Sequence, residues 1–239
     1  DCVMDKKNEL VEIKKNGVGY GLLIENDGYM KMPKDKIKES LGDGGEWNVP
    51  YPFVVDAVFQ KYGIKNANGR VYPENVLKKQ VELYQQKIQE RRAIGECNHP
   101  AESVIDLGRV SHNITELHWE GHTLVGKMEL NVSMGFVKHG ICSTLGDTVA
   151  NLLLNGYKIG VSSRGIGSVE QKFGETIVGD DYELICWDIV SDPSTPNAWI
   201  GEEEELKQYV ESSSKDGNKI NESNSTKSKI DKINHILES

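Results

Sequence analysis

The sequence predicts an α+β domain built on a small, mainly antiparallel β-barrel or sheet, flanked by helices and carrying extended termini. Short segments rich in β-branched and aromatic residues recur between turn signals, which is typical of antiparallel strands. Two segments instead show the spacing of amphipathic helices, and they interrupt the strands without alternating regularly with them. Polar stretches at both ends have the composition of extensions rather than of a core.

The first 45 residues are predicted to form an N-terminal extension, because Lys, Asp and Gly are frequent there. A short strand is expected within it at residues 20–24, and a helical turn at residues 33–41. The folded domain is predicted from residue 46 to residue 210. Its strands are expected over residues 51–59, 104–117, 123–130, 158–163 and 182–190.

Two helices are predicted inside the folded domain. The first begins at Pro73, since proline suits the first turn of a helix, and its apolar residues recur at helical spacing until near Arg92. The second covers residues 144–154. Its stop signal is Asn155 followed by Gly156, because glycine tolerates the left-handed conformation at a helix end.

The C-terminal part of the chain loses the apolar pattern after Trp199. Residues 211–239 are predicted to be a flexible tail, because residues 212–229 are rich in Ser, Lys and Asn. Short helical segments are expected on either side of this linker, at residues 202–205 and 230–237.

Composition and charge argue against two classes of function. The formal net charge is −9 in a chain of 239 residues, so direct binding of nucleic acid is not expected. No apolar run approaches the ~18 to 20 residues that span a bilayer. Residues 1–12 alternate in charge and do not read as a secretory signal. We therefore expect no association with a membrane.

The four cysteines lie at positions 2, 97, 142 and 186, and no two of them have the C-x-x-C spacing of a zinc or redox site. They are expected to be reduced thiols in a cytosolic setting. The sequence therefore predicts neither a metal nor another cofactor.

A candidate nucleophile lies in residues 161–165 (VSSRG), where a strand is predicted to end in a turn at Arg164 and Gly165. A serine at such a strand end, Ser162 or Ser163, can be exposed beside main-chain N–H groups, which is the geometry of acyl transfer. The commoner alternative is a polar strand end whose serines satisfy the turn.

Candidate bases and acids are less distinct. His99 precedes Pro100, which moves the histidine away from helical conformation. Asp188 and Asp106 are each flanked by apolar residues in predicted strands, so each requires a partner or an exposed face. Taken singly, His99 is best interpreted as a loop histidine, and both aspartates are best interpreted as residues on solvated strand faces. Either aspartate could instead orient a histidine.

Four motifs that follow one another along the sequence strengthen these individually weak indications of a catalytic site. They are residues 68–73 (NGRVYP), 95–100 (GECNHP), 160–168 (GVSSRGIGS) and 193–199 (PSTPNAW). This series resembles the prohead core proteases of T-even phages over roughly residues 47–200. Residues 1–45 match no part of the family pattern.

The resemblance implies roles for individual residues. It implies that His99 is the catalytic base and that Ser162 is the nucleophile. The family is related in fold to the herpesvirus assembly proteases, which have a small β-barrel wrapped by helices and a third catalytic residue on a strand after the serine. That role falls on Asp188, with Asp106 as its rival, and Arg164 with Gly165 are expected to help stabilise the oxyanion.

The resemblance also implies a function. It implies a serine endopeptidase of capsid maturation, which acts inside the prohead in the infected host cytoplasm on scaffold or core proteins and on the major capsid protein precursor. A homo-oligomer is expected. The family cleaves after Glu with an aliphatic residue two positions earlier, so self-cleavage is predicted at such triplets. They end at Glu12, Glu25, Glu39, Glu222 and Glu238.

Two alternatives from other classes stay open on sequence alone. One is a catalytically inactive capsid or scaffold component that keeps the protease-like barrel. The other is a metal-dependent hydrolase that uses His99, Glu96 and Asp106, although this spacing falls on a predicted loop rather than a helix.

Overall fold

The computed structural model describes residues 11–14, 16–31, 47, 49–98 and 102–191. Several predictions fall outside these residues. They are the helical turn at 33–41, the segments after residue 200, and His99 itself.

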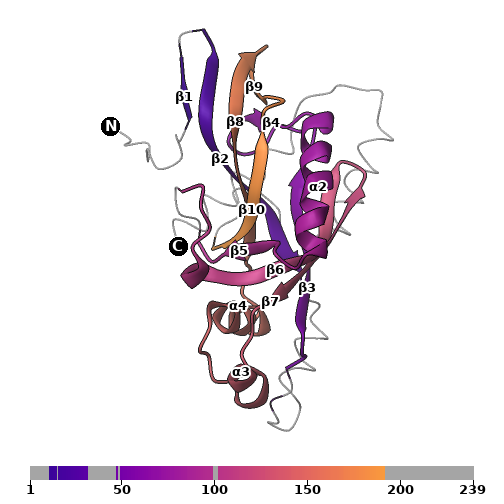
Figure 1. Cartoon of the computed structure of the whole chain (residues 1–239), viewed down its shortest axis with the longest axis vertical. Helices are drawn as coiled ribbons and strands as arrows, with labels where there is room; N and C mark the ends of the chain where they lie inside the picture. Colours follow the sequence, from indigo (N-terminus) through magenta and orange to yellow (C-terminus); the bar gives the residue numbers. More distant parts are fainter. Residues whose placement is uncertain (1–10, 15, 32–46, 48, 99–101, 192–239) are drawn as a thin grey trace, which may run out of the picture. The chain divides into compact units, whose positions relative to one another are not determined.

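The described residues form one ten-stranded sheet with three α-helices and a short 3-10 helix, Leu107–Arg109 (Figure 1). The strands are β1 (Val11–Ile13), β2 (Val18–Lys31), β3 (Phe53–Lys61), β4 (Arg70–Val71), β5 (Ile94–Glu96), β6 (Val110–Glu120), β7 (Thr123–Leu130), β8 (Gly160–Lys172), β9 (Glu175–Val178) and β10 (Glu183–Val190). The helices are α2 (Glu74–Gln89), α3 (Met134–His139) and α4 (Leu145–Leu154).

Neighbouring strands are paired in the order β4-β9-β8-β2-β3-β7-β6-β5, with β1 added to β2 and β10 added to β8. Every ladder is antiparallel except that between β4 and β9. The antiparallel sheet is therefore as predicted. Within the described residues the ladder does not close on itself, so the sheet is shown and the expected barrel is not.

The segment after β5, which ends this path, nevertheless comes close to β10, the strand added to β8. Cys97, directly after β5, forms an isolated parallel bridge with Ile189 of β10. The N–H of Asn98 donates to the carbonyl oxygen of Ile189 at 2.8 Å. This contact, which we call the β5–β10 seam, brings together segments that lie far apart along the sheet.

Strand β2 belongs to the segment that was expected as an N-terminal extension. It pairs with β8 from Val18 to Tyr29 and with β3 at its C-terminal end. The approach of β3 is close at Gly28, where a Cβ atom would lie 2.4 Å from the carbonyl oxygen of Val58. Residues 18–31 are thus integral to the sheet, and their glycines permit this packing rather than mark a loop.

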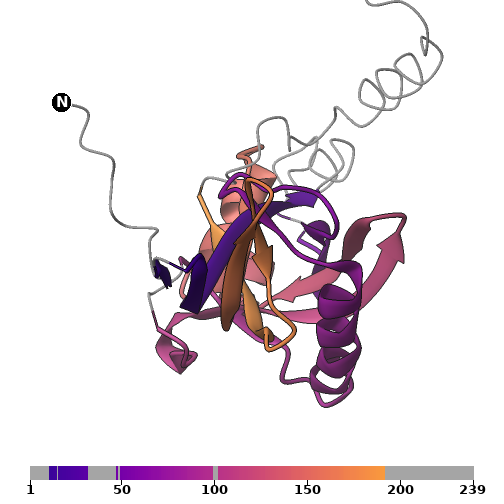
Figure 2. The same ribbon diagram turned by 90° about the horizontal axis from the view of Figure 1, so that it is seen from above.

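The two predicted helices are confirmed as α2 and α4. Helix α2 buries the apolar stripe that predicted it, and Tyr84 packs edge-on against Trp187 of β10 at 5.0 Å between ring centroids. Figure 2 shows α2 beside the sheet. Helix α4 begins with a capping box formed by Thr144 and Asp147. The short helix α3 was not predicted.

The turn expected at Arg164 and Gly165 is wrong. Strand β8 continues through both residues to Lys172, and both are buried. Gly165 is required for a different reason, because a Cβ atom there would lie 2.4 Å from the ring of Tyr182. The expected strand end is therefore the middle of a strand whose two edges are paired with β2 and β10.

Candidate active site

Ser162 and Asp188 occupy directly opposite positions in the β8–β10 ladder. Side chains at opposite positions of an antiparallel pair project from the same face, with Cβ atoms about 4.5–5.5 Å apart. Both residues are buried, with 0% of their surface exposed. The structure therefore brings the predicted nucleophile to the predicted third residue, although not at an exposed strand end.

The ladder also distinguishes the two serines. Arg164 lies opposite Cys186, so it shares a face with Ser162 and Asp188, because side chains alternate along a strand. Ser163 lies opposite Trp187, on the other face. Periodicity alone leaves open which serine faces the acid, whereas the register of the two strands selects Ser162.

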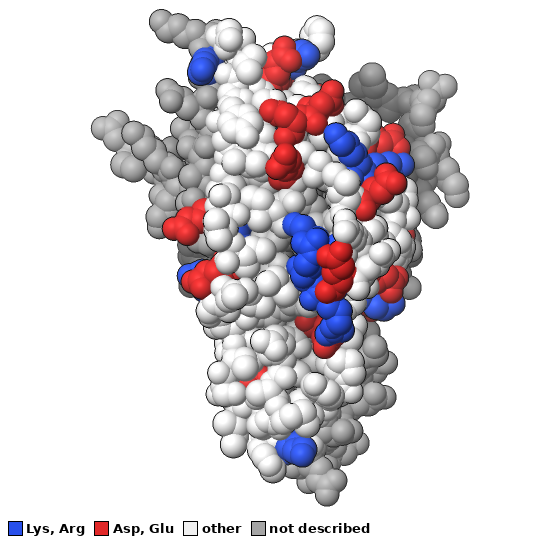
Figure 3. All heavy atoms as spheres, viewed as in Figure 1, with Lys and Arg blue, Asp and Glu red and all other residues white. Residues whose placement is uncertain are grey.

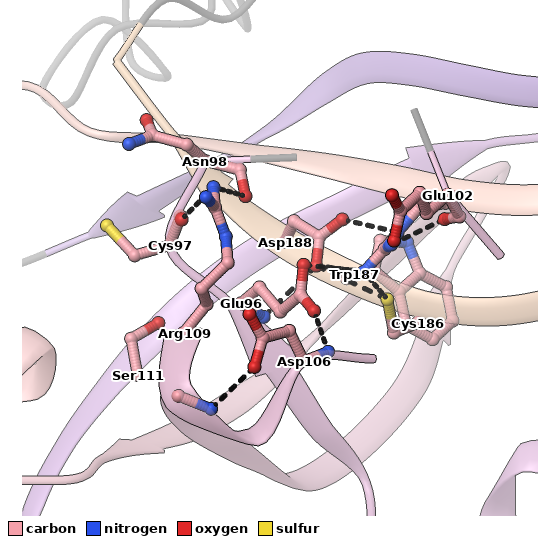
Figure 4. Close-up of polar contacts among 12 residues, drawn as sticks. Glu96, Cys97, Asn98, Glu102, Asp106, Arg109, Ser111, Cys186, Trp187 and Asp188 are labelled. Atoms are coloured by element: carbon pink, nitrogen blue, oxygen red, sulfur yellow. Dashed lines mark hydrogen bonds and ion pairs between the residues drawn. The ribbon is translucent and has the colours of Figure 1, made fainter. Parts of the chain in front are cut away.

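The Asp188 carboxylate has several donors around it, and Figure 4 shows it among Glu96, Cys186 and Asp106. The main-chain N–H of Glu96 donates to Asp188 Oδ1 at 3.0 Å, and the Cys186 thiol donates to the same oxygen at 3.3 Å. Burial, followed by the neighbouring Asp188, raises the pKa of the Cys186 thiol. The thiol therefore stays protonated and can donate.

The buried guanidinium of Arg164 contacts two carboxylates, those of Asp188 and Glu96. Its Nε lies 2.9 Å from Asp188 Oδ2, and its Nη2 lies 3.1 Å from Glu96 Oε2. Its Nη1 donates to the main-chain oxygen of Glu102 at 2.7 Å. Burial alone lowers the pKa of Arg164, but Cys186 and Asp188 raise it overall, so the guanidinium is charged.

The segment before His99 is held against β10. Asn98 has a φ angle of 61°, a left-handed conformation that asparagine tolerates better than most residues. Its N–H is bonded to Ile189 across the β5–β10 seam, and Nη2 of Arg109 donates to the carbonyl oxygens of Cys97 and Asn98, each at 3.1 Å (Figure 4). The residue that precedes His99 in the sequence thus lies beside Ile189, the neighbour of Asp188.

Asp106, the rival third residue, lies in a different environment. It is exposed, and its carboxylate accepts a hydrogen bond from the N–H of Gly108 at 2.8 Å, which caps the 3-10 helix. Its own N–H donates to Oε1 of Glu96. Asp106 therefore supports the loop that begins at residue 102, whereas Asp188 lies opposite Ser162.

His112 is a second histidine near Asp188 that sequence patterns did not single out. Its Nε2 lies 3.0 Å from the carbonyl oxygen of Trp187, so this nitrogen carries the proton, and Nδ1 faces the Ser111 hydroxyl at 3.0 Å. Burial lowers the pKa of His112 to about 4, against the opposite effects of Asp188 and the Trp187 carbonyl. Both ring nitrogens therefore have a polar partner within hydrogen-bond distance.

Comparison with known proteins decides the family. The family described as "Prohead core protein serine protease" matches residues 19–235. The chain belongs to this family.

Two comparisons with phage T4, one of sequence and one of structure, agree with this assignment. The chain is 30% identical to the "Prohead core protein protease" of Enterobacteria phage T4 over 161 residues, which are 66% of the chain and 72% of the relative. Its fold matches the solved bacteriophage T4 capsid assembly protease, gp21, with a TM-score of 0.56 and 26% identity, over 72% of this chain and 98% of that one. The resemblance inferred from four motifs is confirmed, and the matched region begins at residue 19 rather than near residue 47.

A pocket of about 490 Å³ opens next to the site in this prohead core protease. It is lined by Leu107, Gly108, Val110, Asn131 and residues 142–145 with Thr148. Val110 pairs with Glu96, so one wall of the pocket adjoins the strand that leads to His99. The surface over α3 and α4 carries few charged side chains on the face seen in Figure 3.

Three further observations concern metal binding, membrane-spanning helices and the cysteines. Among the described residues, no group of three or more His, Cys, Asp and Glu side chains is placed to hold a metal ion. Within the same residues, no helix is long and apolar enough to cross a membrane. Cys97, Cys142 and Cys186 are free thiols, as the spacing of the cysteines predicts.

Sequence patterns missed Cys186 and His112, and they named Glu96 only as a residue of the alternative metal-dependent hydrolase. One signal was available for Cys186, which lies two residues before Asp188 in a strand and must share its face. Glu96 belongs to the same motif as His99, but nothing in the sequence indicates Arg164 as its partner. The partnership of Glu96 and Arg164 depends on the β5–β10 seam.

Proposed function

We propose that this chain is a serine endopeptidase of capsid maturation, which cleaves scaffold or core proteins and the major capsid protein precursor. Ser162 is the nucleophile, His99 is the general base, and Asp188 is the carboxylate that orients the base. The enzyme acts inside the prohead in the host cytoplasm, as a homo-oligomer. A closed barrel and a common fold with the herpesvirus assembly proteases belong to this proposal.

One observation carries the assignment. Ser162 and Asp188 are cross-strand partners, and Asn98, which precedes His99, is hydrogen-bonded to the residue after Asp188. Three segments, the motifs at residues 95–100 and 160–168 and the strand β10, are separated by stretches of sequence and lie next to one another in the fold. A structural role for each motif alone would not require this convergence.

The mechanism follows from the order of proton transfers in acyl transfer. The Ser162 hydroxyl attacks the peptide carbonyl while His99 accepts its proton, and the proton then passes to the leaving amine. Asp188 favours one tautomer of the base and stabilises its protonated form. Water, activated by the same base, hydrolyses the acyl-enzyme.

Stabilisation of the oxyanion was expected from Arg164 and Gly165. Arg164 and Gly165 were predicted to present N–H groups from a turn, but both lie inside β8. Stabilisation of the oxyanion by these two residues stays a prediction. Because Arg164 lies in the interior of a paired strand, its side chain is favoured as a structural element of the site over its main-chain N–H as an oxyanion donor.

Specificity for aliphatic-x-Glu sequences is proposed to involve the 490 Å³ pocket. Leu107, which is 77% exposed, and Val110 offer apolar surface, while Ser143, Thr144 and Thr148 offer hydroxyl groups. We propose that the pocket receives a substrate side chain near the cleaved bond. Self-cleavage at the matching triplets of this chain other than the one that ends at Glu25, whose side chain is buried, is part of the same proposal.

The decisive experiment compares Ser162→Ala with Ser163→Ala on a purified scaffold-like protein that contains aliphatic-x-Glu sites. Ser163→Ala is a matched control because its side chain lies on the other face of the same strand. We expect Ser162→Ala to lose cleavage by several powers of ten and Ser163→Ala to retain it. Equal cleavage by wild type and Ser162→Ala would remove Ser162 from the mechanism and favour an inactive capsid component.

A further inference from the structure

A buried cluster of one guanidinium and two carboxylates lies next to Ser162. Arg164 Nη2 is 3.1 Å from Glu96 Oε2 and 3.2 Å from Asp188 Oδ1, and none of the three side chains is exposed. One arginine and one carboxylate would form a neutral pair. The second carboxylate makes the cluster anionic as a whole when both acids are ionised.

The cluster connects the three segments that the proposed mechanism needs. Glu96 is the last residue of β5, two positions before Asn98. Arg164 lies two positions after Ser162 in β8, and Asp188 lies opposite Ser162 in β10. A planar guanidinium with its donors in a fixed fork can hold two carboxylates at once, which a lysine ammonium does less precisely.

We propose that Arg164 and Glu96 are positioning residues for the proteolytic reaction. Arg164 fixes the Asp188 carboxylate, and Glu96 offsets the guanidinium charge, so that Asp188 still favours a protonated base. This inference rests on the proposed function, since it takes Asp188 as the acid that serves the base of Ser162.

The reason for a second carboxylate is electrostatic. A guanidinium bound directly to Asp188 opposes the appearance of another positive charge nearby, and in a buried site this effect is only weakly screened. Glu96, bound to the other side of the same guanidinium, restores the negative balance. Without Glu96, a protonated base would meet a neutral ion pair rather than an anionic cluster.

The other titratable groups that interact with Asp188 leave this balance unchanged. Burial raises the pKa of three of them and lowers that of the fourth, so all four are neutral near pH 7. They are Tyr84 on α2, Cys97 after β5, Cys186 on β10 and His112 on β6. The charge around Asp188 is therefore set by Arg164 and Glu96.

The test measures kcat, KM and the pH dependence of kcat/KM for Glu96→Gln and Arg164→Lys on the scaffold-like protein. Glu96→Gln removes the balancing charge, so we expect the acid limb to move to lower pH by roughly 0.5 to 1 unit, with kcat reduced about tenfold and KM little changed. Arg164→Lys keeps the charge but loses the fork, so kcat should fall while the acid limb stays in place. Glu102→Gln is the matched control for loss of a carboxylate, because Glu102 contacts Arg164 only through its main-chain oxygen among the contacts described.

Folding is followed for each variant by thermal unfolding. If Glu96→Gln does not fold, Glu96→Asp keeps the charge in a shorter side chain, and a reduced kcat with a wild-type acid limb then supports the proposal. Wild-type kcat and acid limb in folded Glu96→Gln and Arg164→Lys, or wild-type kcat in Glu96→Asp, would overturn it. Ser162→Ala distinguishes failure of the proposed protease mechanism from failure of the positioning role. If Ser162→Ala is inactive while the Glu96 and Arg164 variants behave as wild type, only the positioning role fails.

Discussion

Ser162 faces Asp188 directly across the β8–β10 ladder, while its neighbour Ser163 faces Trp187 on the opposite side of the same two strands. This register selects one of two adjacent serines as the partner of a buried carboxylate. It also places Arg164 and Cys186 on the face of Ser162, so that the side chains around the candidate nucleophile come from alternate positions of two strands.

The first prediction separates the two candidate third residues. Asp188→Asn should reduce kcat/KM by about a hundredfold or more, because it removes a buried carboxylate that lies opposite Ser162. Asp106→Asn should stay within a few-fold of wild type, since its carboxylate is exposed and caps a 3-10 helix. Cleavage rates of both variants, with thermal unfolding as a control for folding, decide between them. A greater loss in Asp106→Asn would reverse the assignment.

The second prediction concerns His112 and acid stability. In the folded state burial lowers the pKa of His112 to about 4, whereas an unfolded histidine has a pKa near ~6.5. The unfolded chain therefore binds one more proton between these values, and the free energy of unfolding falls as pH drops from about 6.5 to 4, by at most about 1.4 kcal/mol per unit from this group. Urea unfolding at several pH values measures the slope. His112→Gln should lose this part of it; an identical slope in that variant would show that other groups cause the effect.

The third prediction concerns Asp147 at the start of α4. Its carboxylate accepts hydrogen bonds from the N–H groups of Ser133, Ser143 and Thr144 and from two serine hydroxyls. Burial acts to raise the pKa of Asp147, but these hydrogen bonds lower it overall. Asp147→Ala should lower the free energy of unfolding by about 1–2 kcal/mol, since several partly buried donors lose their acceptor.

The pH dependence of that effect can be stated with its sign. Because the folded pKa of Asp147 is depressed, its contribution is present above the unfolded value near ~3.9 and is lost as pH falls through the folded value. Thermal unfolding of wild type and Asp147→Ala at pH 7 and at low pH should show a difference that shrinks on acidification. A difference that stays constant down to pH 2 would contradict this account. Thr148→Ala on the same helix serves as the control for a side chain outside this group of hydrogen bonds.

The fourth prediction concerns self-cleavage. The triplet that ends at Glu25 lies in β2, and the Glu25 side chain is buried, accepting hydrogen bonds from Asn68, Arg70 and Tyr72. No protease can bind this triplet as an extended peptide without removing β2 from the sheet. Intact-mass analysis over time should therefore show no fragment beginning at Asn26 under native conditions. Appearance of that fragment at the rate of other autolytic products would show that β2 opens readily.

The fifth prediction concerns the pocket beside β5. Thr148→Trp fills part of the 490 Å³ volume, so we expect a several-fold rise in KM for aliphatic-x-Glu peptides with a smaller change in kcat. Leu83→Trp, at a position on α2 that is 60% exposed, controls for the addition of an indole to the surface. Equal KM values for the two variants would exclude the pocket from substrate binding.

Much of the secondary structure was predictable because its signals are local. Helix α2 has both a proline start and an apolar stripe, and β7 was predicted with its observed bounds. Strand β2 was largely missed because glycines weaken a strand signal, although here Gly28 is needed for the close approach of β3. Helix α3 has only six residues, and the sequence signals that could predict it are confined to its cap residues, Ser133 and Gly140.

The site was predictable only in part, because its residues lie far apart in the sequence. Ser162 and Asp188 were identified by family resemblance, and their contact depends on a register that no single strand encodes. Arg164 was placed at a turn because Gly165 follows it, yet that glycine makes room for the ring of Tyr182. Interactions between side chains about seventy positions apart, such as Glu96 with Arg164, have no local signature.

The β5–β10 seam has a consequence for the timing of activity during synthesis. Asn98 is anchored by Ile189, so the segment before His99 lacks its anchor until β10 has left the ribosome. Arg164 and Glu96 likewise wait for Asp188 to complete their cluster. A nascent or truncated chain that ends before β10 contains Ser162 and the motif at residues 95–100 but lacks the strand that pairs with β8 and holds Asn98.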